Sequence, residues 1–387
     1  MLDTSFKNTA NQILTYNSIK EIKKEDWDCL TENNVYMSYE YFNTFEETTV
    51  FPLLPYYITV ASNEKILAAS VFYFEPRNST RILDSVLLGR LSKFGVMKKI
   101  TFLPSSICNR QRGHGTHFVF RPNLENDQAI SLQEILIDEI EKIAKDKGAS
   151  VSFLNVTLNQ KALMNSLRKR GYYVTNDLPS NFIDVKWSSF EGYKKYLSEK
   201  RPYMNKSIRH ELNRNRKSGV VIKEEQITAK NEKRLFELLK MNHFKHNVSK
   251  FPLKENYFKK IKEIFGKNAI IYIAEKDGTI IGVSTILKKG KEAFFSSVGI
   301  DHERSKKDFT FFNIGYYEPI RQMIQYNIKR IYFGRGLYNT KIKRGCIAED
   351  MFIFYKTQNK FSAPFVKMWF YFHKKWMSYK FSYVKKI

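Results

Sequence analysis

The length, composition and charge of the chain exclude several classes of protein. At 387 residues it exceeds one ordinary hydrophobic core and predicts two domains. Hydrophobic residues make up 43% and aromatic residues 15%, which excludes a globally disordered chain. The net charge of +26 lies almost wholly in residues 191–387, which carry 43 Lys and Arg against 18 Asp and Glu, whereas residues 1–190 carry 22 against 21.

The basic second half predicts a polyanionic partner, such as RNA, coenzyme phosphates or acidic lipid headgroups. An AT-rich coding sequence is the alternative origin of the lysine excess, but it does not explain the difference between the halves. Three widely spaced cysteines, Cys29, Cys108 and Cys346, give no zinc or disulfide spacing and indicate a reducing compartment. The first residues lack the pattern of a signal peptide. We therefore expect a cytoplasmic protein, with peripheral contact at the inner membrane face as a further expectation.

Two predicted hairpins align without a gap at an offset of 214 residues. "YYITVASNEKILAASVFYF" (residues 56–74) predicts two strands around a polar turn. "IIYIAEKDGTIIGVSTILK" (residues 270–288) has the same pattern, with Asp277-Gly278 as its turn. A pattern repeated at a fixed distance indicates duplication of one structural unit.

A helix and a strand follow each hairpin. In the first half, "SLQEILIDEIEKIAKDKG" predicts a helix opened by a Ser131/Glu134 capping box and closed at Gly148, followed by the strand "VSFLNVTL". In the second half, "FTFFNIGYYEPIRQMIQYN" predicts a helix, followed by the strand "RIYFG". The first half carries a longer insertion between hairpin and helix. We expect a mixed α/β fold with one such unit in each half.

A Lys- and Arg-rich connector joins the two repeats. "YKKYLSEKRPYMNKSIRHELNRNRKSG" predicts helical structure interrupted at Pro202. Two further helices, "NEKRLFELLKMNHFKHN" and "ENYFKKIKEIFG", precede the second hairpin.

The connector and the elements after it resemble those of tandem GNAT-fold acyltransferases, namely the Fem aminoacyltransferases of peptidoglycan synthesis and their FemAB-like or BioF2-like relatives. The resemblance rests on the order of elements: the connector, a hairpin, the strand "EAFFSSVGI", a loop, a helix, a strand that ends in glycine, and a loop with lysine and glycine. It covers residues 190–356 well and residues 35–190 by pattern alone.

The resemblance implies a fold and a reaction. The fold would be two tandem GNAT-like domains, each a mixed, mostly antiparallel sheet flanked by helices and splayed where an acyl carrier inserts. The reaction would transfer an acyl or aminoacyl group to an amine. We expect an acceptor-side domain at 1–188, a basic connector at 189–230, a donor-side domain at 231–360 and an aromatic, basic helix at 361–387.

A first candidate site precedes the second predicted main helix. Single-domain GNAT enzymes hold the coenzyme A pyrophosphate there with a Gly-rich loop, and "DHERSKKDFTFFN" lacks those glycines. Arg304, Lys306 and Lys307 nevertheless stand before a helix start, where phosphate is favoured. Both a phosphate clamp and a solvated turn remain open.

The segment "YFGRGLYNTKIKRGCIAEDM" (residues 332–351) provides the second candidate site. Gly334 and Gly336 allow backbone to approach a ligand closely, and α/β folds place their sites at strand ends. By position in the resembled family, Lys341 would bind a phosphate or carbonyl, with Arg335 and Arg344 in support. The alternative is a basic turn without a ligand.

Acyl transfer to an amine requires a proton acceptor and donors for the developing oxyanion, but no metal and no nucleophilic triad. Acid–base candidates are Tyr332, Tyr338, Asp301, His302, Glu349 and Asp350. His114 and His117 lack a third metal partner, and we expect no bound metal.

Substrate-binding candidates lie in the connector and in the first half. The connector cations would bind a polyanion or coat a solvated helix; they are Lys200, Arg201, Lys206, Arg209, Arg214 and Arg216. In the segment "PSSICNRQRG", Asn109, Arg110 and Arg112 would hold an acidic acceptor. Tyr338 is a further substrate-binding candidate.

The last 27 residues contain ten aromatic residues, six lysines and no acid. A helical stripe is predicted to contain Phe365, Trp369, Phe372, Trp376, Tyr379 and Tyr383. Lys367, Lys374 and Lys385 would lie opposite. Such a helix can lie in an anionic membrane interface; the alternatives are that the aromatic face packs on its own domain or on a second copy of the chain.

The sequence leaves three functions open. The first is an N-acyltransferase that uses acyl-coenzyme A or an acyl carrier protein as co-substrate, with no permanently bound cofactor. The second is a Fem-like transferase that uses aminoacyl-tRNA, which suits the basic half. The third is a non-catalytic protein that binds nucleic acid or a membrane surface. We rank the thioester donor first.

Overall fold

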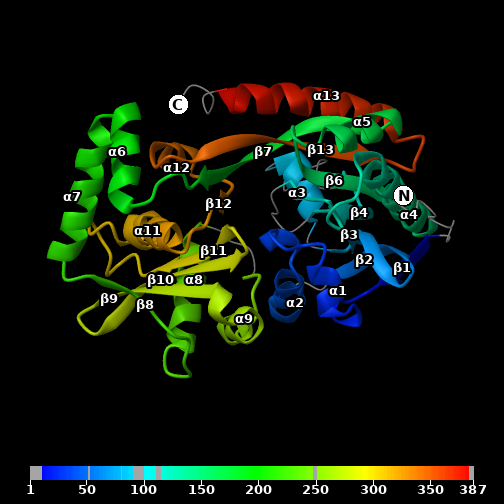
Figure 1. Cartoon of the computed structure of the whole chain (residues 1–387). Coiled ribbons are helices and arrows are strands. Elements are labelled where there is room, and N and C mark those ends of the chain that lie inside the picture. Colours follow the sequence, from blue (N-terminus) through cyan, green and yellow to red (C-terminus); the bar gives the residue numbers. More distant parts are fainter. Residues whose placement is uncertain are drawn as a thin grey trace, which may run out of the picture. The chain divides into compact units, whose positions relative to one another are not determined.

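A computed structural model describes residues 11–50, 53–79, 81–89, 100–109, 115–246 and 251–382. The chain forms two compact units that interleave along the sequence (Figure 1). Of the described residues, those within 1–32, 52–179 and 350–386 form unit 1, and those within 33–51 and 180–349 form unit 2. The contiguous ranges expected from the sequence differ from these units, because residues 33–51 belong to unit 2 and the C-terminal helix belongs to unit 1.

Unit 1 is built on a mixed sheet in the order β1-β2-β3-β4-β6-β13, with β5 paired to β3. All neighbouring strands are antiparallel except β4 and β6, which are parallel. Its strands are β1 (Gln12–Tyr16), β2 (Leu54–Ser62), β3 (Lys65–Glu75), β4 (Ser105–Cys108), β5 (Phe118–Phe120), β6 (Ser150–Thr157), the first part of β7 (Tyr173–Asp184) and most of β13 (Ile347–Lys356).

Helices cover both faces of the unit 1 sheet. They are η1 (Ile19–Glu21), α1 (Lys24–Asp28), α3 (Ile82–Leu88), α4 (Asn126–Asp146), α5 (Lys161–Lys169) and α13 (Ala363–Lys380). One apolar core joins α4 and α5 to β2, β3 and β6, and a second core joins α3 and α13 to β4 and β13. Helix α4 begins at Asn126, five residues before the predicted Ser131, because Glu125 and Gln128 form its capping box.

Unit 2 repeats this plan with the strand order β7-β12-β11-β10-β9-β8. Again one pair, β11 and β12, is parallel and the others are antiparallel. The strands are the last part of β7, β8 (Val221–Glu224), β9 (Ala269–Lys276), β10 (Thr279–Lys289), β11 (Glu292–Ile300) and β12 (Arg330–Gly334). The bounds of β3 and β10 differ by 214 residues at both ends, which confirms the predicted repeat.

The helices of unit 2 pack on its sheet around several apolar clusters. They are η2 (Val35–Met37), α2 (Tyr39–Thr48), α6 (Phe190–Lys200), α7 (Tyr203–Lys217), α8 (Glu232–His246), α9 (Tyr257–Phe265), η5 (Gly266–Asn268), α10 (Thr310–Phe312), the π-helical turn η6 (Asn313–Tyr317), α11 (Glu318–Gln325) and α12 (Tyr338–Lys343). The connector is confirmed as helical, with its break at Pro202 between α6 and α7.

Each unit receives its closing strand from the other half of the sequence. After β6, the chain runs through α5 into β7, whose last residues pair with β12 in unit 2. After β12, the chain runs through α12 into β13, which pairs with β6 in unit 1. The duplicated units are therefore interlaced by an exchange of strands.

Candidate functional site

The parallel pairing of β11 and β12 is short. It joins Glu292, Ala293 and Phe294 to Arg330, Ile331 and Tyr332. Beyond these pairs, the described residues Phe295–Ile300 of β11 have no ladder partner on the β12 side. The backbone of β11 therefore has no strand partner on this side next to the carboxyl end of β12, and we refer to this stretch as the open edge of β11.

Aromatic side chains lie next to the point where the pairing of β11 and β12 ends. The rings of Phe295 and Phe333 lie 5.7 Å apart, and Tyr316 stacks on Phe333 at 5.4 Å. Tyr316 belongs to the π-helical turn η6, and Ser284 of β10 donates a hydrogen bond to the carbonyl of Ile314 in the same turn. Single π-turns inside helices occur frequently at functional sites. The sequence predicted the helix but not this turn.

The loop after β12 turns sharply into α12. Gly334 and Gly336 have φ angles of +64° and +75°, and Leu337 follows at +50°. These left-handed conformations favour glycine. The side chain of Asn181 on β7 donates to the carbonyl of Gly334 at 2.7 Å, which fixes the start of the loop.

Lys341 closes this loop from within. Its side chain is buried, and Nζ donates to the carbonyls of Phe333 (2.7 Å), Gly334 (3.1 Å) and Arg335 (2.9 Å). Burial lowers the pKa of the lysine to about 8, while the three oxygens stabilise its ammonium form. Since an ammonium group has three donors, all of them are used here. The geometry favours a positioning role over the ligand role predicted from the sequence.

Arg344 ties the end of the same loop to the connector. Its guanidinium donates to Glu211 of α7 at 2.7 Å and to the Tyr317 hydroxyl at 3.1 Å, and it lies 3.9 Å from the ring centre of Phe312. The Tyr317 hydroxyl also donates to Glu211. Arg344 is 4% exposed, so this is a buried, paired charge. Burial raises the pKa of Tyr317, which therefore stays protonated.

Asp301 organises the loop after β11. Its Oδ1 accepts the backbone N–H groups of Glu303 and Arg304 at 3.2 Å each, and its Oδ2 accepts from Arg234 of α8 at 2.9 Å. Burial raises the pKa of Asp301, but the Arg304 N–H and the Arg234 guanidinium outweigh it and bring the pKa below its usual value. The following Ser305 N–H donates to the Asp301 carbonyl. Three successive backbone donors are thus already engaged.

The other candidates near this loop differ in accessibility. Arg304, Lys306 and Lys307 are exposed, as predicted for a phosphate clamp or a solvated turn. His302 is half-buried and donates from Nε2 to Asn242 Oδ1 at 3.1 Å, while Asn242 donates to the carbonyl of Val298 on the open edge of β11. His302 is therefore the titratable candidate connected to that edge.

The remaining candidates of unit 2 are mostly structural in their contacts. Tyr332 is buried and donates to Glu292 at 2.8 Å, and burial raises its pKa. Tyr338 is buried at the start of α12, and Arg201 donates to the carbonyl of Ile342 at 3.2 Å. Arg209 is exposed on α7.

In unit 1, Asn109 closes a loop rather than facing outward. Its side chain donates to the carbonyl of Thr116 at 3.1 Å, and the Asn155 side chain donates to the backbone carbonyl of Asn109 at 2.8 Å. Arg110, Arg112 and His114 lie outside the described residues. His117 is buried, donates to the carbonyl of Leu154 and accepts from Gln160, and burial lowers its pKa to about 4. Glu349 and Asp350 lie at the start of β13 and are half-buried.

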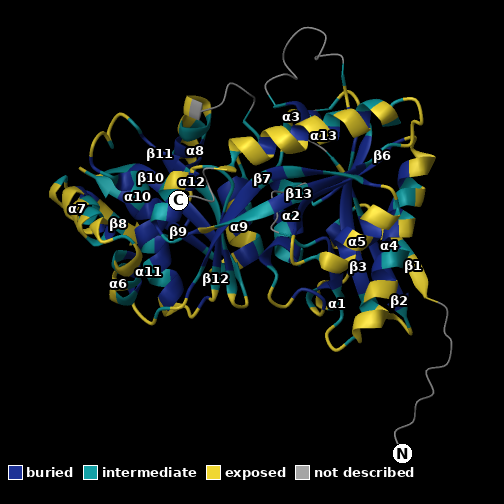
Figure 2. Ribbon diagram, turned by 90° about the horizontal axis from the view of Figure 1, so that it is seen from above, coloured by how far each residue is buried: buried dark blue, intermediate teal, exposed yellow. Residues whose placement is uncertain are grey.

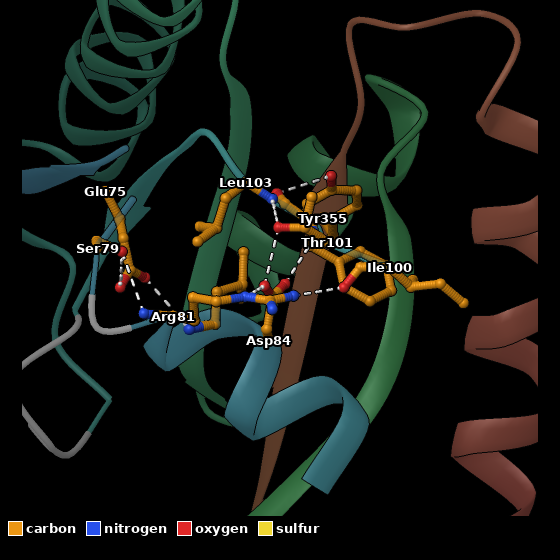
Figure 3. A network of polar contacts seen from close by, with 10 residues as sticks. Glu75, Ser79, Arg81, Asp84, Ile100, Thr101, Leu103 and Tyr355 are labelled. Carbon is orange, nitrogen blue, oxygen red and sulfur yellow. Dashed lines mark hydrogen bonds and ion pairs between the residues drawn. The ribbon is translucent and has the colours of Figure 1, made fainter. Parts of the chain in front are cut away.

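Sequence reasoning missed a polar network at the base of the long insertion in unit 1 (Figure 3). Asp84 is fully buried and accepts from Arg81 (2.7 Å), Thr101 (2.8 Å) and the backbone of Phe102 (2.7 Å). Arg81 also donates to the carbonyl of Ile100 at 2.6 Å. These bonds join the start of α3 to residues 100–102 within the insertion, and no motif in the sequence signals them.

Each unit thus has the GNAT-like arrangement of a hairpin, a third antiparallel strand and a parallel neighbour, so the chain has the fold of tandem GNAT-like transferases. A FemAB-like family model, described as peptidoglycan biosynthesis/recognition, matches residues 18–385. The chain belongs to the FemAB-like family, which confirms the resemblance seen in the connector. Comparison with curated proteins gave no match.

Solved structures share this fold at low sequence identity. The crystal structure of FemX aligns with a TM-score of 0.59 and 11% identity, covering 92% of this chain and 100% of that one. The C-terminal DUF2156 domain of a putative lysylphosphatidylglycerol synthetase from Agrobacterium fabrum gives 0.52 and 13%, covering 89% and 94%. A conserved protein of unknown function from Bacteroides thetaiotaomicron VPI-5482 gives 0.52 and 12%, covering 89% and 100%.

Proposed function

We propose that the protein transfers an aminoacyl group from tRNA to an amine acceptor and so forms an amide. The outer face of α7 carries this proposal. Five cations on it are exposed, namely Lys206, Arg209, Arg214, Arg216 and Lys217. The only acid in the helix, Glu211, is 13% exposed and is paired with the buried Arg344. The outward charge is therefore uncompensated, which favours an extended polyanion such as RNA.

The loop after β11 argues for this donor over coenzyme A. A pyrophosphate needs free backbone N–H groups at this place. Here the N–H groups of Glu303 and Arg304 already donate to the carboxylate of Asp301. A thioester of coenzyme A, ranked first from the sequence, therefore becomes the second choice. Exposed Arg304, Lys306 and Lys307 keep a proposed role as contacts to the phosphate backbone.

The reaction needs few specialised groups. The acceptor nitrogen forms a bond to the aminoacyl carbonyl carbon, the ester bond to the ribose oxygen breaks, and one proton passes from the amine to the departing oxygen. Backbone N–H groups on the open edge of β11 would stabilise the oxyanion. His302, linked to that edge through Asn242, is our candidate for accepting the amine proton. Lys341 and Arg344 position the loop, and the segment that contains Asn109 keeps its proposed role in acceptor recognition.

A transfer assay with total tRNA charged with radiolabelled amino acids tests the proposal. The protein is mixed with charged tRNA and a panel of amine acceptors, and label in an amide product is measured. In a filter-binding assay between 50 and 200 mM salt, changing Lys206, Arg209, Arg214 and Arg216 to Gln should make the negative slope of log K against log salt less steep by roughly 3 to 4.

The matched control neutralises four exposed lysines elsewhere in unit 2, Lys230, Lys233, Lys267 and Lys329, and should change the slope far less. Consumption of an acyl-coenzyme A with amide formation in the absence of tRNA would overturn the choice of donor. Tight tRNA binding without any transfer would support a non-catalytic binding protein instead.

A further inference from the structure

Helix α13 has two different apolar faces, and only one of them packs on unit 1. The packed face contains Val366, Phe370, His373 and Met377, all buried. Phe370 stacks on Tyr355, and Thr175 is hydrogen-bonded to His373 Nδ1 at 2.9 Å. Of the aromatic stripe predicted from the sequence, Trp369 packs on the same core and donates to the carbonyl of Leu87 at 3.2 Å, whereas Phe372, Trp376 and Tyr379 are exposed. The buried stripe has the same spacing but is shifted by one residue from the predicted stripe, which is about 100° around the helix.

Helix α13 carries many exposed residues (Figure 2), and they include the C-terminal half of the predicted aromatic stripe. Phe372 is 59% exposed, Trp376 50% and Tyr379 83%. Phe365 and Trp369 are half-buried, and Tyr383 lies outside the described residues. The exposed apolar set on and just before the helix also includes Phe361, Met368 and Tyr371. So many exposed large apolar side chains on one face mark an interaction surface.

The charge around this face has a single sign. Lys367, Lys374, Lys375 and Lys380 are exposed on the same helix, and residues 361–387 contain no Asp or Glu. Lys375 lies 4.5 Å from the ring centre of Tyr371, and Lys380 lies 4.7 Å from that of Trp376. The cations thus flank the aromatic side chains. Aromatic rings with flanking lysines are the pattern of a helix that lies in an anionic lipid interface.

We propose that the exposed face of α13 binds flat on the surface of an anionic lipid bilayer. Within the described part of the chain, no helix is long and apolar enough to cross a membrane. The opposite face of α13 is already used by unit 1, so the helix would carry the folded protein to the surface. Anionic headgroups complement the lysines, whereas a second copy of this face would bring like charges together.

Vesicle cosedimentation with the full chain tests this proposal. One set of vesicles contains phosphatidylcholine with about one-third phosphatidylglycerol, and the other contains phosphatidylcholine alone. We expect binding to the first set that weakens with salt. Changing Phe372, Trp376 and Tyr379 to Ser should lower the partition coefficient on the order of 100-fold. Changing Lys374, Lys375 and Lys380 to Gln should lower it by a similar factor.

The lysine variant Lys230→Gln/Lys233→Gln/Lys267→Gln has the same loss of charge away from α13 and should bind the vesicles nearly as well as the wild type. Because all substituted side chains are exposed, circular dichroism should show an unchanged fold. Equal binding by the wild type and the aromatic variant would overturn the proposal. So would a lipid-free dimer, seen by analytical ultracentrifugation, that the aromatic variant converts to a monomer, since a second copy would then cover the face.

Discussion

Replacing Lys341 by methionine tests whether this lysine holds the loop after β12 in place or binds a ligand. Methionine keeps a similar unbranched stem but has no donor. The change removes three hydrogen bonds, to the carbonyls of Phe333, Gly334 and Arg335. The Gly334 carbonyl keeps its donor from Asn181 at 2.7 Å. The other two carbonyls lose the donor that Lys341 supplies.

The structure sets the size of the effect. Three hydrogen bonds from a charged group stabilise the fold by about 6 kcal/mol at ~2 kcal/mol each. Burial lowers the pKa of Lys341 from 10.5 to about 8, which corresponds to a cost of about 3 kcal/mol that the variant avoids. We expect a net loss of about 3 kcal/mol, or a drop in Tm of roughly 6–12 °C. Thermal unfolding followed by tryptophan fluorescence measures it, and hydrogen exchange locates the loosened loop.

A dependence on pH provides a second measurement on the same variant. Between pH 8 and 10.5 the unfolded state binds more protons at Lys341 than the folded state, so wild-type stability rises with pH across this window. The methionine variant should lack this increment. Lys343→Met, on the same helix, is the control and should stay within about 0.5 kcal/mol of the wild type. A Lys341→Met protein with wild-type stability and loop exchange but no turnover would refute the loop-holding role.

Three further predictions concern the stability effects of substitutions at other buried or closely packed positions. Glu211→Gln leaves Arg344 buried without a counter-charge and should cost about 3–5 kcal/mol in urea unfolding. Gly299→Ala places a Cβ 2.5 Å from the backbone of α8 and should cost about 3 kcal/mol, whereas Gly315→Ala, with 4.0 Å to its nearest neighbour, should cost far less. Burial lowers the pKa of His373 to about 4, so between pH 6.5 and 4 this histidine binds more protons in the unfolded state than in the folded state. The free energy of unfolding should therefore fall as the pH falls from 6.5 towards 4. His373→Gln should flatten this part of the urea midpoint–pH curve.

Local sequence patterns predicted the fold well. β11 and β12 have the predicted bounds. A strand that is marked by an apolar run between turn residues can be recognised from neighbouring positions in the sequence, without knowledge of the tertiary structure. The predicted start of α4 at Ser131 was wrong, because Glu125 provides the N-cap and Ser131 lies inside the helix. A capping pattern identifies a possible first turn but does not exclude an earlier one.

The candidate site was less predictable. Lys341 and Arg344 appeared as free cations in a glycine-rich loop, yet their partners include carbonyls brought in by the turn and Glu211, 133 residues earlier. Such pairings depend on tertiary structure, so charge and position alone could not reveal them. The same holds for α13, where both stripes have helical spacing and only the packing of unit 1 selects Val366 and Phe370 for burial.

The exchange of closing strands has a consequence during synthesis on the ribosome. When residues 150–157 of β6 have emerged, their antiparallel partner in β13 still awaits translation, about 200 residues later. The edge of β6 that β13 will cover therefore stays unpaired while most of unit 2 is made, and unpaired edges invite aggregation. Expression of residues 1–190 alone would make that exposure permanent. Nascent chains of this protein should accordingly depend on chaperones until residue 356 has left the exit tunnel.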